Sequence, residues 1–303
     1  MLKTSTLKRI KKMKTLAFLI DEMQSAKKLI RYAALLGKDL NAKVHVWYVQ
    51  YPYVHGTNGF DTHAHTGDMG TGSMPDPAYL HEIEKDVKRT VKGYIKDIKK
   101  EFTDIPSIVF KAELGDASKI LEDKVTKGVY DMVMIQGNSE QESWFQKPVA
   151  MDIVRNVPCP VFIVEPDTRY QPFKKIVYAT DYKEEDVSTL KRLTRLAKPF
   201  SPAILTLHIT DDEQFRKRLL KEGFDSMIRE KVGYENVSVK VLEVKDDMDE
   251  AESFANQAKS EKANLIVVLK ENRNFFERLF KSSFTAELVK ETQLPVLVFH
   301  QTK

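Results

Sequence analysis

The hydrophobic positions of the chain fall into short runs that alternate with longer amphipathic stretches. Short apolar runs rich in β-branched residues are typical of buried strands. Apolar residues at three-and-four spacing, as at Ala26, Leu29, Ile30 and Ala33, predict helices. In the first half this pattern predicts strands at residues 15–20, 44–49, 108–112, 132–136 and 161–164, with helices near 24–40, 79–102, 117–127 and 149–156.

The second half shows the same alternation. It predicts strands at residues 175–179, 204–209, 237–244, 265–269 and 296–299, with helices near 185–198, 213–232, 249–260 and 285–292. Strands that alternate with helices indicate an α/β fold, in which helices cover both faces of a parallel sheet.

The two halves are an internal repeat. Asp21 and Asp181 each follow a first strand, and the segment Val-Pro-Cys-Pro-Val at 157–161 matches Thr-Gln-Leu-Pro-Val at 292–296. The spacing between matching positions indicates an insertion in the first half, placed at residues 51–76. We therefore predict two domains, 13–166 and 172–303, joined where Pro166 and Pro172 flank polar residues.

Both halves resemble the universal stress protein family. The resemblance rests on Tyr-Asp-Met-Val-Met-Ile-Gln-Gly at 130–137, on the Pro-rich starts of both fifth strands, and on Ala-Asn-Leu-Ile-Val-Val-Leu at 263–269. The strand ends Leu-Ile-Asp at 19–21 and Ala-Thr-Asp at 179–181 also look like the family.

The resemblance implies a fold. It predicts two tandem doubly wound five-stranded parallel sheets of order 3-2-1-4-5, similar to adenine nucleotide alpha hydrolases. The switch point between the first and fourth strands is where such sheets bind ligands. An exposed apolar edge strand is a liability. We therefore expect the two fifth strands to pair in an intramolecular pseudo-dimer, and the chain has the potential to form a homo-oligomer.

Family members that bind ATP use an aspartate after the first strand and a glycine-rich loop after the fourth. The resemblance therefore implies ligand-binding candidates, which are Asp21, Gly137, Lys147, Asp181, Asn272, Ser282 and Ser283. The four motif positions of the first half are Met134, Gly137, Lys147 and Pro148, so one glycine remains. Those of the second half are Leu269, Asn272, Ser282 and Ser283, with no glycine. We expect neither half to bind ATP in the family's usual way, and no cofactor is assigned.

The insertion contains three of the seven histidines, His55, His63 and His65. Imidazole suits zinc and similar ions, so these residues are metal-ligand candidates. Their spacing does not follow a known metal motif, and a polar glycine-rich loop without a ligand is the alternative interpretation.

The charge of the chain limits the classes of binding partner that are expected. The chain carries +4, but residues 1–14 contain six basic side chains, so the rest carries −2. Nucleic acid is not expected as a partner, because that function requires a basic stripe on the folded domain. Mixed charges at 82–89 are interpreted as a solvated helix face.

No apolar run is long enough to span a membrane, and the single Cys159 fits a reducing, cytoplasmic compartment and a core position. Whether translation starts at Met1 or Met13 stays open.

We expect a non-enzymatic binding or signalling module of the stress response, whose partner is a small ligand or another protein. One alternative is an ATP-binding stress protein, and another is a nucleotide hydrolase. The hydrolase chemistry needs a glycine-rich phosphate loop after the first strand, whereas the turns here are Asp-Glu-Met-Gln-Ser at 21–25 and Asp-Tyr-Lys-Glu-Glu at 181–185. Trp47 and His208 occupy matching positions on the second strands and are expected to pack in the core.

Overall fold

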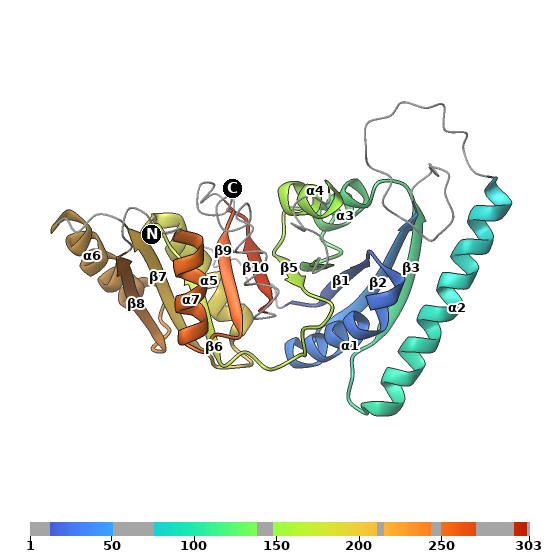
Figure 1. The fold of residues 1–303 in the computed structure, drawn as a ribbon, viewed down its shortest axis with the longest axis horizontal. Helices are drawn as coiled ribbons and strands as arrows, with labels where there is room; N and C mark the ends of the chain where they lie inside the picture. Colours follow the sequence, from blue (N-terminus) through green and yellow to red (C-terminus); the bar gives the residue numbers. More distant parts are fainter. Residues whose placement is uncertain are drawn as a thin grey trace, which may run out of the picture.

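Ten strands form one continuous sheet in the computed structural model, which describes residues 13–50, 76–137, 148–210, 215–243, 250–270 and 294–301. The strand order is β3-β2-β1-β4-β5-β10-β9-β6-β7-β8. Each half therefore has the predicted order 3-2-1-4-5, and the two halves meet in the middle of the sheet (Figure 1). The predicted helix at 285–292 lies outside the described residues.

The elements follow the predicted pattern closely. The first half contains β1 (Thr15–Ile20), α1 (Met23–Leu40), β2 (Lys43–Gln50), α2 (Pro77–Glu101), β3 (Ile108–Leu114), α3 (Ala117–Thr126), β4 (Met132–Gln136), α4 (Pro148–Asn156) and β5 (Val161–Val164). The second half contains β6 (Lys175–Ala179), α5 (Glu184–Ala197), β7 (Ala203–Thr210), α6 (Phe215–Lys231), β8 (Val237–Glu243), α7 (Glu250–Ser260), β9 (Leu265–Leu269) and β10 (Val296–Phe299).

The two halves join through β5 and β10, which pair antiparallel, whereas the other strand pairs of the sheet are parallel. Phe162 of β5 lies opposite Leu297 of β10, and both side chains are buried. This pairing confirms the predicted contact between the fifth strands. It places two apolar edges against each other, away from water.

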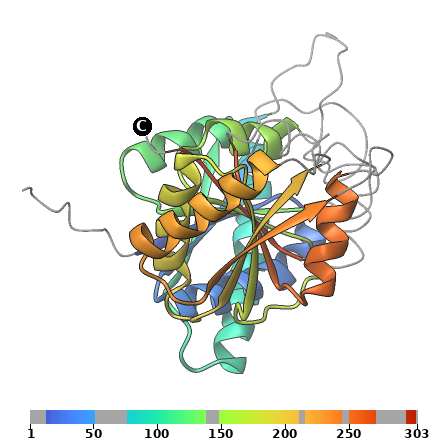
Figure 2. The same cartoon turned by 90° about the vertical axis from the view of Figure 1, so that its left-hand side faces the viewer.

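Helices cover both faces of the sheet, as Figure 2 shows along the length of the molecule. One apolar core packs α1, α2, α5 and α6 against the sheet, and the second packs α3, α4 and α7 against the opposite face. Each core contains residues of both halves. Strands β1, β4, β5, β6, β9 and β10 are buried almost throughout, which explains why they appear in the sequence as continuous apolar runs.

Cys159, Trp47 and His208 occupy the positions expected of structural residues. Burial raises the pKa of the Cys159 thiol to about 12, so the thiol stays protonated and inert at neutral pH. The Trp47 indole N–H donates to the Tyr130 hydroxyl at 2.7 Å, and the Nδ1 atom of His208 lies 2.7 Å from the Thr180 carbonyl oxygen. No helix of the described residues is both long enough and apolar enough to cross a bilayer.

Candidate ligand-binding crevices

The first candidate crevice lies where β1 and β4 end side by side. Asp21 follows β1, and Gly137 follows β4, so the parallel register brings both to the carboxyl edge at the switch point. The Gly137 N–H donates to the Val164 carbonyl at 2.8 Å, which extends the pairing of β4 with β5. The fold thus places these two predicted residues at the same edge of the sheet.

A carboxylate that the sequence analysis missed packs against Gly137. Glu165 follows β5, and its side chain is 4% exposed. A methyl group added at Gly137 would lie 2.3 Å from the Oε1 atom of Glu165, so a side chain there would require the Glu165 carboxyl group to shift. In the family motif a glycine lets the backbone approach a phosphate. Here the carboxyl group of Glu165 occupies the space beside that glycine.

Three polar side chains form a hydrogen-bonded group at this edge of the sheet. The Ser25 hydroxyl donates to Oε1 of the Gln136 side chain at 2.5 Å, and the Gln136 amide donates to Glu22 at 3.1 Å. The Ser25 hydroxyl oxygen also lies 3.1 Å from the Glu22 carbonyl oxygen, the alternative acceptor for its single proton. Gln136 is buried, so these bonds fix the side chains in place at the start of α1. Glu22 and Glu165 thus place two carboxyl groups in the described part of this crevice.

The second candidate crevice lies where β6 ends, and another carboxylate fills the turn. Asp186 has no exposed surface and accepts hydrogen bonds from the Tyr178 hydroxyl at 2.5 Å and the Thr180 hydroxyl at 2.9 Å. It also accepts the backbone N–H groups of Asp181 at 3.1 Å and Lys183 at 3.0 Å. Burial raises the pKa of Asp186 above its ordinary value, and these hydrogen bonds offset part of that shift.

Free N–H groups at a helix start are what an anion would bind. Beside the start of α5 the Asp186 carboxylate, three residues into the helix, accepts the N–H groups of Asp181 and Lys183, which directly precede the helix. The signal in the sequence was an acidic residue at the third helical position, which is typical of a capping box. Because Glu184 and Glu185 lie in the same turn, the sequence does not distinguish Asp186 as the buried acid.

Tyr182 covers the neighbouring part of the turn. Its backbone has φ of 60°, and its ring packs on His208 at 4.5 Å and on Phe224 at 5.1 Å between ring centroids. Asp181 pairs with Lys183 at 3.5 Å. The predicted site residue Asp181 is thus at the expected carboxyl edge, beside a turn that aromatic packing and Asp186 already hold.

The remaining site predictions lie outside the described residues. These are the ligand candidates Lys147, Asn272, Ser282 and Ser283, and the metal candidates His55, His63 and His65. Across the residues that the structure describes, no group of histidine, cysteine and acidic side chains could hold a metal ion.

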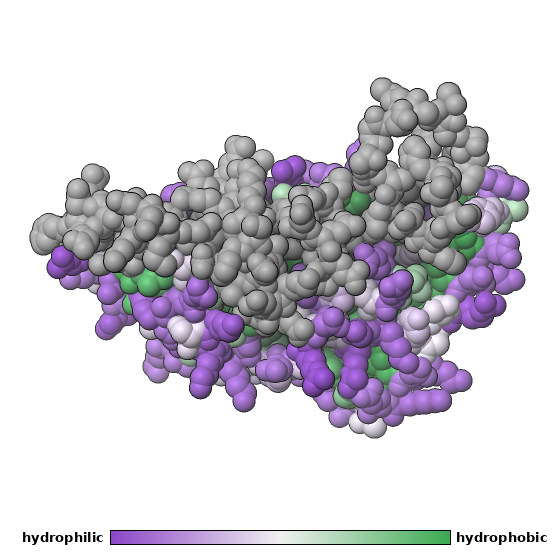
Figure 3. Space-filling model, in the orientation of Figure 1, coloured by the Kyte–Doolittle hydropathy of each residue, from purple (hydrophilic) through white to green (hydrophobic). Residues whose placement is uncertain are grey.

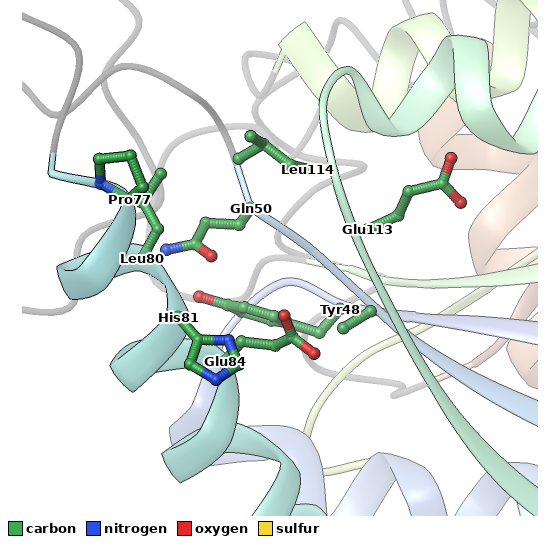
Figure 4. A pocket seen from close by; sticks show the side chains of 9 residues that line it. Tyr48, Gln50, Pro77, Leu80, His81, Glu84, Glu113 and Leu114 are labelled. Carbon is green, nitrogen blue, oxygen red and sulfur yellow. The ribbon is translucent and has the colours of Figure 1, made fainter.

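A pocket of about 220 Å³ opens farther out along the sheet, where β2 and β3 end beside the start of α2 (Figure 4). Tyr48 and Gln50 of β2, Leu80, His81 and Glu84 of α2, and the end of β3 line it. It is smaller than the roughly 300–1,000 Å³ of ordinary small-molecule sites. Glu113 of the wall forms an ion pair with Lys124 at 3.1 Å. The pocket is therefore distinct from the predicted crevices and is too small to hold a nucleotide.

Comparison with known proteins supports the resemblance found in the sequence. Residues 172–300 match the model of the universal stress protein family. A universal stress protein of Methanocaldococcus jannaschii is 24% identical over 143 residues, which is 43% of this chain and 84% of that protein.

The likeness of fold extends over both halves. The crystal structure of a universal stress protein from Archaeoglobus fulgidus superposes with a TM-score of 0.64 at 14% identity, covering 95% of this chain and 97% of that one. The cytoplasmic domain of a prokaryotic cation chloride cotransporter superposes with a TM-score of 0.53 at 10% identity, covering 94% and 95% of the two chains. At these identities the likeness establishes the α/β fold and carries no functional assignment.

Proposed function

We propose that the whole chain is a tandem universal stress protein, which acts in the cytoplasm as a binding or signalling module of the stress response and catalyses no reaction. The family match of residues 172–300, the repeated fold and the like order of strands in the first half support this proposal. The chain binds a small ligand or a partner protein, and it does not hold ATP in the usual manner of the family.

One observation carries the last statement: the Glu165 carboxyl group occupies the space beside Gly137, the one glycine that remains of the first-half motif. In the second half, the Asp186 carboxylate accepts the N–H groups of Asp181 and Lys183 and so holds the turn between β6 and α5. Binding of ATP beside Gly137 would require the Glu165 side chain to leave its buried position, which costs free energy.

Calorimetry with ATP and magnesium tests this proposal. We expect no binding in the low micromolar range for the wild-type chain. The Glu165→Ala variant is the matched comparison, because it removes the charge beside Gly137 without altering the backbone. Low-micromolar binding by the wild type would contradict the proposal. Binding gained only by the variant would show that the carboxylate blocks the crevice. Release of phosphate from ATP at a catalytic rate would favour the hydrolase alternative.

A further inference from the structure

A continuous basic stripe runs along α2. Seven exposed cations lie between positions 85 and 100 of this helix, which are Lys85, Lys88, Arg89, Lys92, Lys96, Lys99 and Lys100. At 3.6 residues per turn they fall on an arc of about 120°, and the stripe is about 22 Å long. Every residue of α2 that falls on this arc between those positions is a lysine or an arginine.

The acidic residues of this part of α2 lie on its flank, outside the stripe. Asp97 pairs with Lys27 of α1 at 3.0 Å, and Glu101 pairs with Arg31 of α1 at 2.6 Å. The hydrogen bond and charge of Lys27, with the nearby Lys100 and Lys96, lower the pKa of Asp97, so this carboxylate stays ionised. Because the carboxylates are directed toward α1, they leave the outer arc without negative charge.

The lysines of the stripe are not neutralised elsewhere. Within the described chain, Lys85, Lys88, Lys92, Lys99 and Lys100 form no ion pair, and neither does Lys96. Arg89 pairs with Asp86 at 3.1 Å at the border of the arc. Helix α2 packs inward through Val87, Val91, Ile95 and Ile98, which lie outside the arc, so the cations face solvent.

The stripe is accessible to a large partner. Helix α2 lies along the outer end of the molecule beside the edge strand β3, and hydrophilic residues cover most of its surface (Figures 1 and 3). Gly93, at the margin of the arc, has open space around it. Among the described residues, a long anionic polymer has room to lie along the helix without displacing any element.

We propose that this stripe binds the phosphate backbone of double-stranded nucleic acid. A row of cations about 22 Å long spans roughly six base pairs at 3.4 Å each. The arc carries no apolar side chain that would enter a lipid surface, which distinguishes it from a membrane-binding helix. It also carries no asparagine, glutamine or aromatic residue to read bases, so the binding is independent of sequence. The net charge of −2 outside residues 1–14 conceals the stripe, because opposite charges are segregated on different surfaces.

Fluorescence anisotropy with labelled 20-base-pair duplexes of two unrelated sequences tests the proposal on the full chain. We expect equal affinity for both duplexes, and a slope of log Kd against log salt that corresponds to about four to six phosphate contacts. The variant Lys88→Gln/Lys92→Gln/Lys96→Gln should bind roughly 10- to 100-fold more weakly at 0.1 M salt and lower the slope by about three. Glutamine preserves helix propensity, so α2 should persist.

The matched control is Lys198→Gln/Lys231→Gln/Lys259→Gln, which removes the same charge from exposed positions of the second half. Both variants retain the basic residues 1–14, so a difference between them isolates the stripe. The control should keep the wild-type slope. The proposal is overturned by an equal loss in both variants, by absence of duplex binding at 50 mM salt, or by binding to vesicles of anionic phospholipid and not to duplex.

Discussion

Asp186 holds the turn between β6 and α5 in place through its buried carboxyl group. It is fully buried and accepts four hydrogen bonds, from Tyr178, Thr180 and the backbone of Asp181 and Lys183. Asp186→Ala would leave these donors without an acceptor. We expect it to lower the free energy of unfolding by roughly 2–4 kcal/mol, measured by urea denaturation at neutral pH. The exposed control Asp104→Ala should stay within about 0.5 kcal/mol of wild type.

The raised pKa of Asp186 gives a second prediction. Because burial raises the pKa in the folded state, the native protein binds more protons than the unfolded chain between the two pKa values. The contribution of this group to stability therefore decreases as pH rises through that window. Asp186→Asn does not titrate, so the stability of the wild type relative to this variant should decrease as the pH rises above about 4, the ordinary pKa of an aspartate. A difference that grows with pH would contradict the assignment.

Gly137 provides a test of the filled crevice. A methyl group there would lie 2.3 Å from the Glu165 carboxylate, so Gly137→Ala should cost about 1–3 kcal/mol of stability. The cost should be smaller when Glu165→Ala is present, with a coupling of roughly 1 kcal/mol in a double-mutant cycle. Gly93→Ala is the control, because a methyl group on this exposed helix meets nothing within 4 Å and should stabilise by about 0.5–1 kcal/mol. Equal effects at the two glycines would contradict this account.

At the scale of elements, a helix of the first half is completed by the second half. The Lys270 ammonium donates to the Arg155 carbonyl at 2.5 Å, and the Nε2 atom of His300 lies 2.7 Å from the Val154 carbonyl. Cations and donors at a helix C-terminus stabilise its unpaired carbonyls and its dipole. Lys270→Met should therefore cost about 1 kcal/mol in thermal or urea unfolding. Lys259→Met, on the exposed surface of α7, should change stability by less than about 0.5 kcal/mol.

Most strands could be placed from the sequence alone because burial on both faces makes them continuous apolar runs. The observed bounds of β1, β4, β5, β6, β9 and β10 coincide with the expected ones. The expected ranges were shorter where strands end in polar residues, as at Glu113 in β3 and Thr210 in β7, since pairing there leaves no hydrophobic signal. Helix ends differ by one or two residues, which is the ordinary uncertainty of capping positions.

The chemistry of the crevices was harder to predict than the elements. Asp21, Gly137 and Asp181 could be assigned to the carboxyl edge because strand ends fix them. Glu165 and Asp186 could not be assigned, because whether an acid after a strand folds inward or faces water depends on tertiary packing. The basic stripe of α2 was missed because an expectation based on net charge averages over surfaces that the helix period separates.

At the scale of the whole molecule, the same tandem fold occurs in proteins whose names indicate different roles, a universal stress protein and a domain of a cotransporter. Fold alone therefore does not determine function, which depends on the sites and surfaces that each sequence adds. In this chain the added features are the Glu165 carboxyl group beside Gly137, the buried Asp186 in the turn after β6, and the stripe on α2. The proposed function of the stripe is therefore to bind a macromolecule at the exterior of the fold, whereas the family's nucleotide site lies inside it.

The central pairing of β5 with β10 implies that the two halves unfold as one cooperative unit. Both apolar cores contain residues of both halves, and Leu297 of β10 lies buried opposite Phe162 of β5. Leu297→Ala should cost about 2–5 kcal/mol. Hydrogen exchange should then accelerate together in β1 of the first half and β6 of the second half, because both strands contribute to apolar cores that extend across the central pair.

Leu114→Ala is the matched control for this experiment. Leu114 lies at the end of the outer edge strand β3 and is 50% exposed, so its loss should cost less than about 1 kcal/mol and leave exchange in β6 unchanged. Acceleration of β6 alone in the Leu297→Ala variant would mean that the halves are energetically independent and that their shared sheet is only a contact. A single transition that is observed by exchange in both halves would instead make the ten-stranded sheet the unit of folding.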